Sequence, residues 1–128
     1  MLPDHIKALL APYFPELDLE CICIREGIPW YVMMNAIAYA DRGRIYFAPG
    51  RYDPDSPGGI AIIAHELAHC AQYKNHGVWR FRLLYVSSWL AEFLRHRSLD
   101  QAYSRNRFEV AAREVEERVF ADLCDRRI

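Results

Sequence analysis

The sequence lacks an excess of charge of either sign. Its 16 basic residues nearly balance its 17 acidic residues, and the formal net charge is −1. Proteins that bind nucleic acid or anionic membranes carry a strong basic field, so we expect neither partner. Long hydrophobic runs are also missing, because charged residues interrupt every apolar stretch before the roughly 20 residues of a transmembrane helix. The first residues, Met1 to His5, do not have the pattern of a secretion signal. The sequence therefore predicts a cytoplasmic protein.

Cysteine is scarce as well, with four in the chain. Cys21 and Cys23 lie two positions apart in a predicted strand, where a disulfide between them would be strained. Free thiols are typical of a reducing compartment, and we expect them here. Internal repeats, low-complexity segments and linker-like stretches are missing too. A chain of 128 residues, of which 52% are hydrophobic, predicts one folded domain over residues 1–128.

The order of hydrophobic patterns predicts a small α+β fold. Ser56 is a candidate N-cap for a central helix, Pro57 suits its first turn, and Gly77 follows its end. The fold that we expect has an N-terminal helix and a short antiparallel sheet packed on the central helix, followed by two further helices. The predicted elements are a helix over residues 3–14, a strand over 17–25, a hairpin with arms 36–40 and 44–48, and helices over 57–75, 78–97 and 104–123.

One motif in the central helix carries chemistry. His65, Glu66 and His69 form the pattern His-Glu-x-x-His, which is typical of zinc enzymes. Residues four apart on a helix share a face, so both imidazoles can bind one Zn²⁺ ion. Glu66 can then act as general base toward a zinc-bound water, whose pKa the metal lowers.

A chance match is the plain alternative to a metal site. Random placement gives this pattern in roughly one chain of this length and composition in a hundred. The motif also lies in an otherwise apolar helix, where two imidazoles and a carboxylate without partners would cost several kcal/mol. A bound metal satisfies all three side chains together, so we expect Zn²⁺ binding.

The third ligand has to come from outside the motif. A metzincin would place a third histidine at position 75, but that residue is Asn75 and a histidine follows only at position 76. A carboxylate on the last predicted helix is the natural candidate, and Glu109 precedes two alanines that allow close helix packing. Its rivals are Glu114, Glu116, Glu117 and, from the preceding helix, Glu92. All of these could equally be solvated surface carboxylates.

Two stretches of the sequence resemble a known family. Residues 43–50 (Gly-Arg-Ile-Tyr-Phe-Ala-Pro-Gly) and 65–72 (His-Glu-Leu-Ala-His-Cys-Ala-Gln) are similar to the metallopeptidase domain found in core proteins of extracellular contractile injection systems. The likeness spans about residues 20–75 and, more loosely, 103–113. That family is in turn similar to the gluzincins, peptidases in which a glutamate on a later helix completes the zinc site.

The resemblance implies roles for individual residues. It implies that His65, His69 and Glu109 bind zinc and that Glu66 is the general base. It also implies that residues 45–48 form a strand that pairs with an extended peptide substrate. One position departs from the gluzincin pattern, because Arg113 stands where an aspartate often orients a zinc-bound histidine.

A group that stabilises the oxyanion is also needed for peptide hydrolysis. Tyr103, His76 and Arg105 are candidates, and an ordinary packing or surface role competes for each. Tyr103 is our choice as a catalytic residue because of its nearness to Glu109. Cys70 follows a ligand directly, but one residue turns the helix by about 100°, so we expect a buried thiol there.

These observations predict a zinc metallopeptidase that hydrolyses peptide bonds of a peptide or protein substrate with a zinc-bound water activated by Glu66. The alternative is a catalytically latent zinc-binding module that anchors a partner. A weaker alternative is a buried polar helix that binds no metal. Between positions 80 and 107 there are six arginines and only two acidic residues. This local excess of basic side chains indicates either a solvated surface or a patch for a protein partner.

Overall fold

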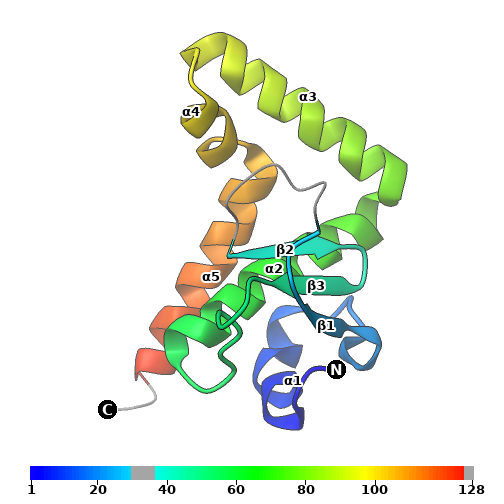
Figure 1. Ribbon diagram of the computed structural model, residues 1–128, viewed down its shortest axis with the longest axis vertical. Coiled ribbons are helices and arrows are strands. Elements are labelled where there is room, and N and C mark those ends of the chain that lie inside the picture. The colour runs from blue at the N-terminus through cyan, green and yellow to red at the C-terminus, as the bar shows by residue number, and fades with distance from the viewer. Residues whose placement is uncertain (30–36, 126–128) are drawn as a thin grey trace.

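The structure is a computed structural model that describes residues 1–29 and 37–125 (Figure 1). Short 3-10 turns, η1 and η2, accompany the regular elements. In chain order the elements are α1 (Asp4–Leu10), η1 (Ala11–Tyr13), η2 (Leu19–Cys21), β1 (Cys23–Glu26), β2 (Ala38–Asp41), β3 (Arg44–Phe47), α2 (Pro57–His76), α3 (Val78–His96), α4 (Leu99–Ser104) and α5 (Arg107–Asp125).

The α+β class that the sequence predicts is confirmed. The sheet has the strand order β1-β3-β2, and the predicted hairpin is present as the antiparallel pair β2–β3. Ala36, at the start of its predicted first arm, lies outside the described residues. β1 joins the other edge of β3 in parallel, which makes the sheet mixed. Helix α2 passes between the sheet and α5, while α3 runs along the upper side of the molecule (Figure 1).

Local sequence sets the limits of α2. The hydroxyl of Ser56 accepts a hydrogen bond from the amide of Gly59 at 3.0 Å, which caps the helix, and Pro57 opens the first turn. Gly77 ends the helix with a φ of 80°, a backbone conformation that glycine adopts without strain. Both ends lie within one residue of the prediction.

The strand expected over residues 17–25 is shorter in the structure. The side chain of Asp18 accepts a hydrogen bond from the amide of Glu20 and so caps η2. The chain becomes extended only at Cys23, which places Cys21 in the turn and Cys23 in the strand. The local hydrogen bond competes here with strand pairing, as short acidic side chains often do.

The last predicted helix, expected over residues 104–123, begins later in the structure, at Arg107. Its expected first residue, Ser104, instead ends the separate short helix α4. Asn106 is fully buried, and its side-chain oxygen accepts a hydrogen bond from the amide of Phe108 at 3.0 Å. Its side-chain amide donates to the carbonyl of Tyr85 on α3. Asn106 therefore both starts α5 and fastens it to α3.

Two hydrophobic clusters hold the elements together. The larger joins α1, the sheet, α2 and α5, and its fully buried members include Ile6, Ile45, Ile63, Leu67 and Val119. The smaller consists of Tyr73, Phe81 and Phe108, one each from α2, α3 and α5. It fixes the three helices that carry the candidate site. Within the described residues, no helix is both long enough and apolar enough to cross a membrane.

Candidate metal centre

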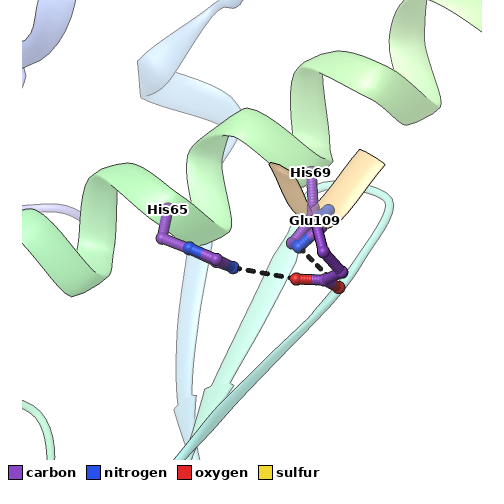
Figure 2. A group of neighbouring side chains, drawn as sticks. All are labelled: His65, His69 and Glu109. Atoms are coloured by element: carbon purple, nitrogen blue, oxygen red, sulfur yellow. Dashed lines mark hydrogen bonds and ion pairs between the residues drawn. The ribbon is translucent and has the colours of Figure 1, made fainter. Parts of the chain in front are cut away.

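Three side chains from two helices converge on one point (Figure 2). The imidazoles of His65 and His69 project from the same face of α2, one turn apart, with ring centroids 5.0 Å from each other. The carboxylate of Glu109, from the first turn of α5, lies between them. Its two oxygens are each 3.2 Å from a histidine Nε2, one from His65 and the other from His69.

These distances match those of a metal site. Ligands held at about 2.0–2.2 Å around a tetrahedral ion lie roughly 3.3–3.6 Å from each other. One ligand atom from each of the three side chains can be chosen so that all lie within 4.8 Å of one another. The residues are therefore close enough to hold a metal ion. No other group of this kind occurs in the part of the chain that the structure describes.

The outward nitrogens of the two histidines are also occupied. Nδ1 of His65 lies 2.7 Å from a carboxylate oxygen of Glu116, and Nδ1 of His69 lies 2.8 Å from the side-chain oxygen of Gln72. The amide group of Gln72 donates to the carbonyl of Phe108, which directs its oxygen toward His69. Acceptors at Nδ1 favour the tautomer that offers Nε2 to a metal.

The same contacts determine the protonation of the metal-free site. Burial lowers the pKa of each histidine, but hydrogen bonds to Glu109 and the surrounding carboxylates outweigh it and raise the pKa of both. For His69 the pKa rises to about 9. The carboxylate of Glu109 is buried, yet the two imidazoles hold its pKa far below its usual range. At neutral pH the metal-free site is therefore an imidazolium–carboxylate cluster.

Glu66 lies in the same electrostatic environment without joining the cluster. Its side chain is buried and forms no hydrogen bond with the described residues. Burial raises its pKa, while the charges of His69 and His65 oppose that rise. A raised pKa brings a carboxylate closer to the range that suits a general base at neutral pH.

A tyrosine that the sequence did not indicate holds the third candidate ligand. The hydroxyl of Tyr85, on α3, donates a hydrogen bond of 3.0 Å to Glu109. Tyr85 packs on the buried ring of Phe108, and its carbonyl accepts the amide of Asn106. Nothing in the position of Tyr85 along its predicted helix indicates a hydrogen bond to α5.

The three predicted oxyanion candidates occupy different surroundings. Burial raises the pKa of Tyr103, and the nearby carboxylates of Glu109 and Glu66 raise it further, so its phenol lies beside the site. His76 instead packs edge-on against the ring of Phe108. Arg105 hydrogen-bonds the side chain of Gln101 at the end of α4. The structure thus brings only Tyr103 of these three into the electrostatic environment of the cluster.

The rival carboxylates lie elsewhere, apart from Glu116. Glu114 and Glu117 are exposed on the outer side of α5, and Glu92 pairs with Arg95 and His96. Glu116 lies two turns after Glu109 on the same helix face, a spacing of seven that could have indicated its contact with His65. Arg113 reaches the carbonyl of Ser104 instead.

Two further expectations concern the surroundings of the site. The expectation that residues 45–48 pair with a peptide is wrong, because β1 and β2 already occupy both edges of β3. The expectation for Cys70 is confirmed: the thiol is buried, and burial raises its pKa to about 12. Cys21, Cys23, Cys70 and Cys124 are all free thiols.

Comparison with known proteins adds one relationship. No curated protein and no solved structure matches the chain at a significant level. Residues 1–77 match the family described as the eCIS core domain, the core domain of extracellular contractile injection systems. The matched residues contain the whole of α2, with His65, Glu66 and His69, whereas Glu109 lies beyond them. Because the match covers more than half of the chain, the protein belongs to the eCIS core domain family.

Proposed function

We propose that the protein is a zinc-dependent metallopeptidase of the gluzincin type. The observation that carries this proposal is the convergence of His65, His69 and Glu109 around one point, with the buried carboxylate of Glu66 beside it. Two imidazole nitrogens and one carboxylate oxygen form a donor set that is typical of catalytic zinc sites. A zinc ion held there supplies Lewis acidity toward water and toward a carbonyl oxygen.

The residues of the chain then have separate tasks. Glu66 takes the proton of the attacking water on its carboxylate and later returns it to the leaving amine. Glu116 and Gln72 keep the imidazoles in the ligating orientation. The phenol of Tyr103 remains protonated at neutral pH, since burial raises its pKa. It can therefore donate a hydrogen bond to the developing oxyanion.

An edge strand is needed to hold an extended peptide. Among the described residues, β2 is an edge strand of the sheet, with β3 as its one neighbouring strand. β2 also packs directly on α2, the helix that carries the two histidines. We assign substrate pairing to β2 in place of β3.

The substitution Glu66→Gln tests the proposed chemistry. It keeps the size of the side chain but removes its basicity, so zinc should remain bound while peptide hydrolysis falls by at least about 100-fold. Hydrolysis is measured on unfolded casein and on a quenched peptide library, and zinc is quantified in the same samples. Glu117→Gln, an exposed change on α5, is the matched control and should leave both unchanged. Equal cleavage by Glu66→Gln and the unaltered chain would rule out Glu66 as the base.

A second candidate function is a latent metal-binding module. The side chains of His65, His69 and Glu109 are only 15%, 10% and 6% exposed, which is typical of a metal with a structural role. Stoichiometric zinc without cleavage of any library peptide would favour this function. On either reading, membership of the eCIS core domain family supports assembly with other injection-system proteins.

A further inference from the structure

On the side that faces away from the metal centre, helix α3 carries an apolar surface that no other described element covers. Its inward face holds the buried Phe81 and the site residue Tyr85. The opposite face carries five large apolar side chains that are between 47% and 80% exposed. These residues, which we call the α3 stripe, are Trp79, Leu83, Val86, Leu90 and Leu94.

The stripe has the spacing of a helix-packing seam. Its members follow one another at intervals of four, three, four and four residues, which keeps them on one line along the helix. The line extends over about 22 Å, or roughly four helical turns. Ser87 and Ala91 are exposed beside it, and such small side chains allow a second helix to approach closely. An exposed line of this kind fits an amphipathic helix better than it fits a strand.

The charges at the two ends of the stripe indicate what charge a partner should carry there. Arg80 and Arg97 are both exposed, and neither forms an ion pair with the described part of the chain. The acidic residue of α3, Glu92, already pairs with Arg95 and His96. The surface is thus apolar along its length and positive at its ends.

A second copy of the chain is a poor occupant of this surface. In an antiparallel pair of α3 helices, Arg80 of one copy lies near the end of the other helix, where Arg97 follows. In a parallel pair each arginine meets its own counterpart. Both arrangements bring like charges together, and the one acidic residue of α3, Glu92, is already paired. A different protein with acidic ends avoids this repulsion.

We propose that the α3 stripe is the docking site for an amphipathic helix of another protein, one with an apolar face of about four turns and acidic residues at both ends. This proposal goes beyond the metal chemistry, because the stripe and the site occupy opposite faces of α3. Its success or failure is therefore independent of whether the chain hydrolyses peptides.

Two synthetic helical peptides test the proposal. Both carry leucine at the two inward heptad positions over two heptads, about four turns, and they differ only in having glutamates or lysines at their ends. Binding of the labelled peptides to the full chain is followed by fluorescence anisotropy. We expect the glutamate-ended peptide to bind about tenfold more tightly or better, because it pairs with Arg80 and Arg97.

Variants of the chain identify the surface. The double change Leu83→Ser with Leu90→Ser should weaken binding by about tenfold or more, and Leu99→Ser, at a residue that is 66% exposed outside the stripe, should not. The double change Arg80→Glu with Arg97→Glu should reverse the preference between the peptides. Because all these side chains are exposed, circular dichroism should show an unchanged helix content.

Several outcomes would overturn the proposal. They are equal binding of the two peptides, no binding of either, and binding that the stripe variant does not weaken. Sedimentation of the chain as a dimer that Leu90→Ser dissociates would show that a second copy covers the stripe. Binding to phosphatidylserine vesicles with no discrimination between the peptides would assign the stripe to a membrane surface.

Discussion

At the scale of single residues, each candidate ligand of the site is held by a hydrogen bond to a second side chain. His65 has Glu116, His69 has Gln72, and Glu109 has Tyr85. Such partners fix the orientation of a ligand before the metal arrives, so less entropy is lost on binding. The supporting residues come from α2, α3 and α5, which means that the site is complete only when all three helices are packed.

Replacement of Glu116 tests this support. Glu116→Gln removes the charge that faces Nδ1 of His65 but keeps the shape of the side chain. We expect the affinity for zinc to fall by about 10- to 100-fold. Competition with a chelating dye measures the change, and the adjacent exposed residue supplies the control Glu117→Gln, which should bind zinc as the unaltered chain does. Equal affinity for both variants would contradict the assigned role of Glu116.

Proton release on metal binding tests the electrostatics. In the metal-free protein the pKa of His69 is raised to about 9, so its imidazole is protonated at pH 7. Zinc needs the neutral ring, and its binding must therefore displace protons. The apparent affinity should increase as the pH rises from 6 toward 9. Calorimetry in two buffers of different ionisation enthalpy should give different apparent heats at pH 7. Identical heats would show that the histidines are already neutral before the metal binds.

At the scale of elements, α2 is the helix on which the fold and the site both depend. It contacts the sheet on one side and α5 on the other, and most of its residues are buried. Its start is held by the turn before it, where Asp53 binds the hydroxyl of Ser56 at 2.6 Å. That turn passes so close to the helix that only glycine fits at position 59.

A pair of glycine substitutions tests this close approach. A Cβ atom at Gly59 would lie 2.0 Å from the carbonyl oxygen of Asp53, whereas at Gly58 it would meet nothing within 4 Å. Gly59→Ala should therefore lower the free energy of unfolding by about 1–3 kcal/mol. Gly58→Ala should leave it unchanged or raise it by up to about 1 kcal/mol. Urea denaturation measures both, and equal effects would contradict the described turn.

The elements also show how far the sequence determines the fold. Both ends of α2 could be predicted, because Ser56, Pro57 and Gly77 are local signals that act through their own backbone neighbours. The short strand β1 and the break before α5 could not. They depend on the side chains of Asp18 and Asn106 forming specific hydrogen bonds, which periodicity does not reveal. The parallel pairing of β1 with β3 likewise depends on contacts between distant parts of the chain.

The same distinction applies to the candidate site. His65 and His69 follow from spacing within one helix, so their shared face was predictable. Glu109 required a choice among several carboxylates, and the resemblance and the small neighbouring residues favoured it before any geometry was known. Tyr85 and Gln72 were not assigned to the site, because the sequence gives no measure of which helix faces approach each other.

At the scale of the whole molecule, the family match divides the chain into two regions, residues 1–77 and the helices that follow them. Residues 1–77 belong to the matched domain and supply two candidate ligands, while the helices beyond supply the third and its supporting tyrosine. A bound metal would connect α2 to α5 across that division. The apolar stripe on the outer face of α3 lies in the second region, so metal binding and docking use opposite sides of one helix.

The central claim is that His65, His69 and Glu109 together bind one zinc ion. Native mass spectrometry of the full chain with equimolar zinc tests it most directly. The unaltered chain and the control Glu117→Gln should each retain one zinc ion, whereas the double change His65→Ala with His69→Ala should retain none and Glu109→Gln should bind at least about tenfold more weakly. A metal-free unaltered chain, or zinc retained equally by the double histidine variant, would contradict the account.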